Sequence, residues 1–230
     1  MYYIYMADYR LYEKNGVHII IYSLFIAYFF DPLLGFYYYL KMFAWSYYHN
    51  FNYLYDNPSL YKWKHLVRLT DTGHIANCLF YIYPQYLPIC HNVQFVICAG
   101  YYVPKLFLGT KDKDDKGDPE LFSLLQDIHS NLIHSVPYGI LCYYNCKQDY
   151  EFTNATLFYS YLWIYSWLLC VYLPWRFYTN DYVYPMLEQN VPFTVKSSII
   201  ILLHIFVYTA NQFGGFIQSF FYVLRHLEIR

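Results

Sequence analysis

Four polar residues in the apolar segment 121–146 fall on one helical stripe. The segment LFSLLQDIHSNLIHSVPYGILCYYNC is long enough to cross a membrane, yet it carries Asp127, Asn131, His134 and Tyr138 at i, i+4, i+7 and i+11. Polar and ionisable groups in hydrocarbon are costly, and they usually face a bundle interior and mark a working site. The stripe therefore predicts a polar cavity. The alternative is that these side chains only hydrogen-bond neighbouring helices.

A second set of reactive residues lies at the start of the apolar segment 69–87, in the sequence RLTDTGH. Thr70 and His74 are four residues apart, so they would share a helix face. A threonine hydroxyl is a poor nucleophile by itself and needs a base within hydrogen-bond reach, which His74 or His134 could supply. The structural alternative is that Thr70 bonds the carbonyl one turn back or caps a helix start. Spacing alone favours this structural role.

The composition places these residues in a membrane protein. Of 230 residues, 58% are hydrophobic and 13% are charged, about half the charged fraction that is usual in soluble domains. The net charge of −1 gives no basis for nucleic-acid binding. The histidines and cysteines show no metal-binding spacing, so no metal is expected and the six cysteines are interpreted as reduced structural thiols.

The apolar segments predict an all-α fold, a polytopic membrane bundle of about six transmembrane helices forming a single domain over residues 1–230. The expected spans are residues 17–39, 69–87, 93–108, 121–146, 155–175 and 198–224. The first is interrupted by Asp31-Pro32 and is interpreted as one kinked span, with two shorter pieces as the alternative. No cleavage site follows it, so we expect it to stay as a signal anchor.

Three motifs occur in an order that is found in a known group of membrane proteins. They are residues 64–81, KHLVRLTDTGHIANCLFY, residues 131–141, NLIHSVPYGIL, and residues 163–188, a Trp-rich span followed by NDYVYPMLE. Together these motifs cover about residues 60–220. The set resembles the androgen-induced protein family, which includes the androgen-dependent regulator of tissue factor pathway inhibitor and fungal relatives.

The resemblance implies a six-span membrane hydrolase that cleaves fatty acid esters of hydroxy fatty acids. Carried over by position, it implies Thr70 as the nucleophile and His134 as its base. The H-x-x-P spacing of His134 and Pro137 is similar to that of fungal relatives, whereas an ungapped match to members with a longer spacing favours His129. Thr72 competes with Thr70. The resemblance further implies an endomembrane location, foremost the endoplasmic reticulum, a lipid ester from the bilayer as the binding partner, and no cofactor.

The implied chemistry is acyl transfer through a covalent intermediate. Thr70, near a span end, suits an ester carbonyl that arrives near the membrane interface. Imidazole suits the role of base because its unperturbed pKa, about 6.5, is near working pH. Asn131 could fix the tautomer of His134 or donate to the oxyanion. Further candidate donors are Asn77, Asn211 and Gln212.

Two other functions fit the same sequence. The first is a non-catalytic endomembrane scaffold or assembly protein, which would keep the bundle and need no approach of Thr70 to His134. The second is a small transporter with Asp127 and His134 as a proton relay, which would need a polar path open to both faces. The Tyr184–Glu188 loop is interpreted as a structural cap of a helix end.

Overall fold

The computed structural model describes residues 67–107, 120–180, 184, 187 and 191–227. The predicted first span, 17–39, lies outside the described residues, as do the side chains of Asp127 and His129. Contacts divide the chain into two compact units, Met1–Tyr61 with Asp114–Asn131, and Lys62–Lys113 with Leu132–Arg230. All side-chain contacts given below lie within the second unit.

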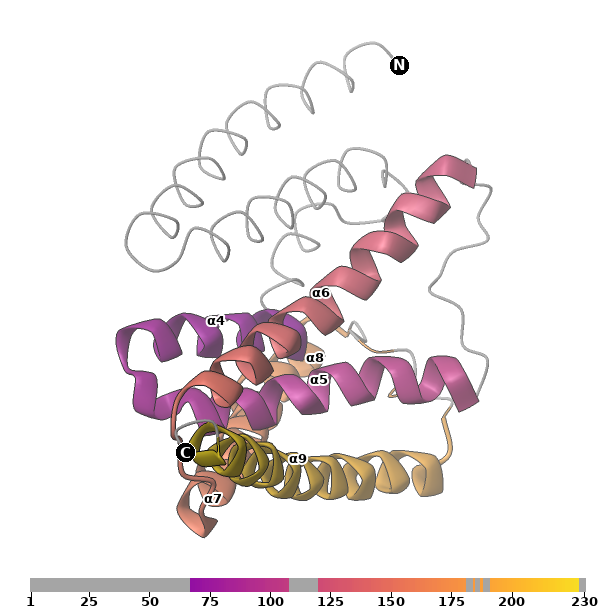
Figure 1. The fold of residues 1–230 in the computed structure, drawn as a ribbon. Helices are drawn as coiled ribbons and strands as arrows, with labels where there is room; N and C mark the ends of the chain where they lie inside the picture. The colour runs from indigo at the N-terminus through magenta and orange to yellow at the C-terminus, as the bar shows by residue number, and fades with distance from the viewer. Residues whose placement is uncertain (1–66, 108–119, 181–183, 185–186, 188–190, 228–230) are drawn as a thin grey trace. The chain divides into compact units, whose positions relative to one another are not determined.

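Every regular element in the described residues is a helix, so the predicted all-α class is confirmed for this part of the chain. In order they are α4 (Leu69–Ile82), the short 3-10 helix η1 (Pro84–Tyr86), α5 (Leu87–Phe107), α6 (Glu120–Lys147), α7 (Asn154–Trp167), the π-helix η2 (Leu168–Tyr172), α8 (Leu173–Thr179) and α9 (Phe193–Leu227) (Figure 1).

Prolines explain two of the places where the helices depart from the predicted spans. The predicted span 69–87 is divided in the structure, because α4 ends at Ile82 and the next long helix, α5, begins at Leu87 with Pro88 in its first turn. A proline is tolerated there because the first N–H groups of a helix have no partner within it. The fifth apolar segment changes to a π-helical turn just before Pro174, a residue that cannot donate a backbone hydrogen bond.

Helix α5 is the central element of the second unit. It packs against α4, α7 and α9, and Figure 1 shows it lying between α4 and α9. Its buried face mixes apolar and polar side chains, namely Leu87, Cys90, His91, Asn92, Val93, Gln94, Val96 and Ile97. Since a buried polar group is costly without a hydrogen-bond partner, the partners of these polar residues show which helices they join.

Asn92 joins three helices. Its Nδ2 donates to Ser160 Oγ on α7 at 3.0 Å and to Asn211 Oδ1 on α9 at 2.9 Å. Thr156, in the first turn of α7, also donates from Oγ1 to Asn211 Oδ1 at 3.1 Å. The same Thr156 forms a capping box with Thr153, which begins α7. These bonds set the positions of α7 and α9 on α5.

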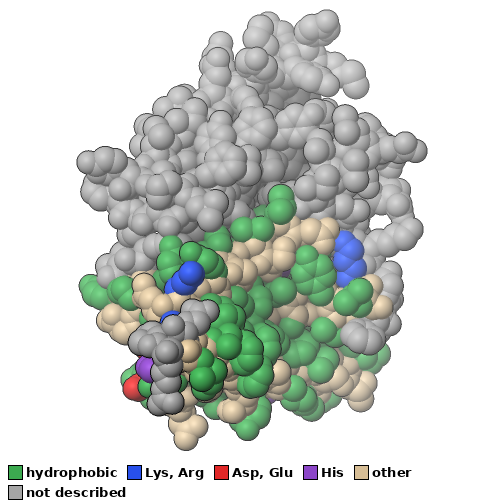
Figure 2. Space-filling view, viewed as in Figure 1, with side chains coloured by type: hydrophobic (Ala, Val, Ile, Leu, Met, Phe, Trp, Pro, Cys, Tyr) green, Lys and Arg blue, Asp and Glu red, His purple; other side chains and the backbone are tan. Residues whose placement is uncertain are grey.

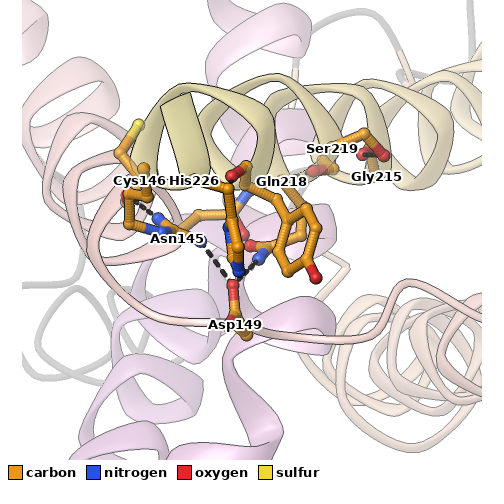
Figure 3. Close-up of polar contacts among 10 residues, drawn as sticks. Asn145, Cys146, Asp149, Gly215, Gln218, Ser219 and His226 are labelled. Carbon is orange, nitrogen blue, oxygen red and sulfur yellow. Dashed lines mark hydrogen bonds and ion pairs between the residues drawn. The ribbon is translucent and has the colours of Figure 1, made fainter. Parts of the chain in front are cut away.

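The C-terminal half of α9 is tied to the end of α6 and the connection that follows it (Figure 3). Buried Asn145 donates from Nδ2 to the carbonyl of Gly214 at 3.0 Å. Gln218 Nε2 donates to Asp149 Oδ1 at 2.8 Å, and Arg225 forms an ion pair with Asp149. The ion pair is solvent-accessible and worth little alone, so the buried Asn145 bond is the stronger constraint.

Within the described residues, two continuous helical stretches are long and apolar enough to cross a membrane, judged by length and composition. They are Asn154–Thr179, with a mean hydropathy of 1.3, and Phe193–Leu227, with 1.7. Only 22% and 11% of these windows are buried, unlike the core helix of a soluble protein. Figure 2 shows the described face covered largely by hydrophobic side chains, with few charged ones.

Candidate functional site

The structure brings Thr70 and His134 together across 64 residues of sequence. Thr70 lies in the first turn of α4 and is 8% exposed. Its Oγ1 is 3.4 Å from Nε2 of His134, which is half-buried on α6. This is a long hydrogen bond, and catalytic hydrogen bonds are often long before substrate binds. A hydroxyl and an imidazole in this arrangement can act as a nucleophile and its general base.

Tyr101 of α5 holds the His134 ring from one side. The two rings are stacked, with centroids 4.0 Å apart and planes 5° apart. Lys105, one turn along α5, donates from Nζ to the Tyr101 hydroxyl at 3.1 Å. A stacked ring restricts rotation of the imidazole without using either of its nitrogens, so Tyr101 fixes the plane in which His134 meets Thr70. The sequence interpretation did not include Tyr101.

The other two candidates on α4 have structural partners. His74 Nε2 lies 3.2 Å from the carbonyl of Ile133, so His74 joins α4 to the α6 backbone beside His134. Thr72 donates from Oγ1 to the Leu69 carbonyl at 2.9 Å, the backbone bond that is common for a helical threonine. Thus the helix face predicted from the spacing is real, but Thr70 and His74 meet different groups on α6.

Two aromatic residues hold the start of α4, and we call Trp167 and Tyr184 the aromatic clamp. The Trp167 indole donates from Nε1 to the Val67 carbonyl at 2.7 Å, and the Leu69 N–H donates to the Tyr184 hydroxyl at 2.8 Å. The rings contact each other edge to face, 6.1 Å apart. First-turn N–H groups have no partner within a helix, so the clamp supplies one next to Thr70. Of the Tyr184–Glu188 loop, only Tyr184 and Leu187 belong to the described residues, and Tyr184 accepts this backbone bond.

The polar stripe of α6 continues from His134 to Tyr138, and both residues meet α5. Tyr138 OH lies 3.3 Å from His91 Nε2, and their rings are 5.1 Å apart. His91 and Tyr138 form a polar contact one turn along α6 from the Thr70–His134 pair. Of the predicted stripe, the Asp127 side chain lies outside the described residues, and so does the second-choice base His129.

The predicted oxyanion donors have different surroundings. Asn211 is bonded to Asn92 and Thr156 in the α5–α7–α9 contact, and Gln212 is exposed on α9. Asn77 is buried on α4, two turns from Thr70. The structure adds Gln94, a fully buried residue of α5 that the sequence interpretation missed. The sequence does contain a signal for Gln94, because residues 91–94, HNVQ, place three polar side chains inside an apolar run.

A surface hollow on η2 and α8 does not coincide with this pair. It is lined by Leu169, Leu173, Pro174, Arg176, Phe177, Tyr178 and Asn180. Neither Thr70 nor His134 is among these residues, so the hollow offers them no access. Within the described part of the chain, no three His, Cys, Asp or Glu side chains lie together as a metal site would require.

Comparison of the chain with family models, curated proteins and solved structures found no match. The site is therefore interpreted from its own geometry, and the family resemblance of the three motifs stays a proposal.

Proposed function

We propose that this chain is a membrane-embedded hydrolase of lipid esters, with Thr70 as nucleophile and His134 as general base. One observation carries the proposal. Two side chains that could form a nucleophile and base lie 3.4 Å apart, although 64 residues separate them. Contacts from Tyr101 and the aromatic clamp support it, because they hold the base and the nucleophile-bearing turn from separate elements.

In the proposed reaction, Thr70 Oγ1 attacks the ester carbonyl carbon while His134 Nε2 takes the hydroxyl proton. The tetrahedral intermediate then collapses and its C–O bond to the alcohol breaks. The leaving alkoxide takes the proton back from His134, which leaves an acyl group on Thr70. Water then attacks this acyl group while His134 takes a proton from it. The bond between the acyl carbon and Thr70 Oγ1 breaks, Thr70 takes the proton back from His134, and the free acid leaves. Fatty acid esters of hydroxy fatty acids are the proposed substrates.

The proposed setting is an endomembrane, foremost the endoplasmic reticulum, with about six spans in the full chain. The two apolar helices support membrane insertion, because large hydrophobic side chains on α9 such as Ile201, Ile205 and Phe216 are about half exposed or more. In water such a surface would favour aggregation. In a bilayer it faces lipid, from which an ester substrate could reach Thr70.

The test is labelling by a fluorophosphonate probe in membranes, together with release of free acid from a fatty acid ester of a hydroxy fatty acid. Thr70→Ala and His134→Ala should both abolish labelling and turnover. The matched controls are Thr72→Ala, on the same helix, and His204→Ala, an exposed histidine of α9. Both controls should retain activity, because their side chains lie outside the pair.

A wild-type protein that is abundant and folded, yet neither labels nor releases acid, would overturn the hydrolase proposal. The non-catalytic scaffold would then be the better interpretation. Activity that survives in Thr70→Ala but is lost in Thr72→Ala would transfer the nucleophile to Thr72.

A further inference from the structure

Gln94 is a buried amide that the fold does not use. The residue is 0% exposed in the middle of α5, and neither Oε1 nor Nε2 has a hydrogen-bond partner among the described residues. Its polar neighbours on α5 are bonded, since Asn92 joins α7 to α9 and His91 meets Tyr138. Most buried side-chain amides are hydrogen-bonded, and an exception needs an explanation, of which a catalytic role is one.

The position of Gln94 relates it to the Thr70–His134 pair. A Cβ atom built on Gly73 would lie 3.1 Å from Gln94 Nε2, so the amide faces α4 at Gly73. Gly73 is three residues after Thr70, on the same side of α4. Because Cβ atoms at this spacing lie about 5–6 Å apart, Gln94 Nε2 is within about 9 Å of Thr70 Cβ.

Because Gly73 has no side chain, the Gln94 amide can lie close to the backbone of α4. A side chain at this position would lie 2.2 Å from Ile97 Cδ1 and would crowd the Gln94 amide. Asn77, one turn further along α4, has a buried Oδ1 that is also unpartnered in the described part of the chain. Tyr101, which stacks on His134, lies two turns from Gln94 on α5. The α4–α5 contact therefore holds unused hydrogen-bonding groups within two helical turns of Thr70.

Attack on an ester places negative charge on the carbonyl oxygen, and hydrolases stabilise it with fixed hydrogen-bond donors. We infer that the Gln94 carboxamide is this donor: Nε2 binds the ester carbonyl oxygen and the oxyanion that forms when Thr70 attacks. This inference rests on the proposed function. Burial strengthens such a bond because little water competes for the charge. It also explains why the amide remains unused by the fold.

The test is Gln94→Met, which keeps the length of the side chain and removes its donors. We expect kcat to fall about 100- to 1,000-fold with KM little changed. The thermal unfolding midpoint should not fall, because replacing an unpartnered buried amide by an apolar group removes no hydrogen bond. The matched control is Gln85→Met in η1, whose exposed amide should be dispensable.

Gln94→Met with wild-type kcat, in a protein that Thr70→Ala inactivates, would refute the role of Gln94 and leave the proposed function standing. If Thr70→Ala turns over like wild type, the proposed function fails and the role of Gln94 falls with it. Should Gln94→Met lower the unfolding midpoint, Gln94→Asn decides. This variant keeps the amide but withdraws it by one methylene, and we expect at least a tenfold loss of kcat, whereas wild-type kcat would overturn the inference.

Discussion

Thr70 and Thr72 are two residues apart on α4, and their surroundings give them different chemistry. Thr72 donates its hydroxyl to the backbone one turn back, which lowers the freedom of that hydroxyl to attack a substrate. The Thr70 hydroxyl instead meets His134 on another helix. Thr70 is therefore the proposed nucleophile, because its side of α4 faces α6. The aromatic clamp holds the first turn of α4, which carries Thr70.

We predict that Tyr184→Phe destabilises the protein and slows turnover at Thr70. The variant keeps the ring contact with Trp167 but removes the hydroxyl that accepts from Leu69 N–H. Loss of one such bond costs about 1 kcal/mol, or about 2–4 °C in the unfolding midpoint of a chain this size. Thermal unfolding in detergent and ester turnover would be measured side by side.

Tyr165→Phe is the matched control for that substitution. The Tyr165 hydroxyl lies 3.3 Å from Nδ1 of His204 at an exposed position, far in sequence from α4. Its loss should change the midpoint by less and leave turnover unaltered. Equal effects of the two substitutions would show that the bond to Leu69 has no special role in holding Thr70.

At the scale of helices, the closeness of α9 to the segment before α7 depends on a glycine. A Cβ atom on Gly214 would lie between 2.1 and 2.7 Å from three ring atoms of Phe152. That ring also packs edge to face on His91 of α5, at 5.2 Å. Since His91 meets Tyr138 of α6, a shift of Phe152 would be transmitted to the contact between α5 and α6.

We predict that Gly214→Ala lowers the free energy of unfolding by about 1–3 kcal/mol, the usual cost of overpacking a filled core. Gly139→Ala on α6 is the control, because no atom lies within 4 Å of its Cβ position. There the higher helix propensity of alanine should give a gain of up to about 1 kcal/mol. In thermal or denaturant unfolding, we expect Gly214→Ala to lower the free energy of unfolding and Gly139→Ala to raise it. A stabilising Gly214→Ala would contradict the packing described here.

At the scale of the whole molecule, the exposed apolar surface of α9 allows membrane insertion to be tested. We predict that the chain stays in the membrane pellet after carbonate extraction. We further predict that Ile205→Lys, a half-exposed position inside α9, reduces the amount of inserted protein. A lysine at the centre of a span costs about 2.5–3.5 kcal/mol on insertion scales.

Leu227→Lys is the matched control, at the exposed end of the same helix. A lysine there can extend its ammonium into water, so insertion should be unchanged. On a soluble protein both exposed substitutions would be nearly neutral. Wild-type levels of Ile205→Lys, with release of the chain by carbonate, would contradict membrane insertion.

For the described residues, the sequence allowed the long helices to be recognised, though not all of their ends, because length and apolar content are local properties of a segment. The boundary between 69–87 and 93–108 was wrong for a specific reason. Prolines such as Pro84 and Pro88 can follow the end of one helix or stand in the first turn of the next, and in the structure Pro88 lies in the first turn of α5. Proline is compatible with both positions, and only the course of the whole backbone distinguishes them.

The sequence by itself determined that Thr70 and His74 share a face of α4 and that His134 and Tyr138 share one of α6, because helical periodicity is fixed by the backbone. Only the tertiary structure decided that Thr70 meets His134 while His74 meets the Ile133 carbonyl. The contacts of Tyr101, Tyr184 and Gln94 likewise became visible only there. The physical reason is that the rotation and register of one helix against another depend on the packing of all their side chains at once, which no local pattern contains.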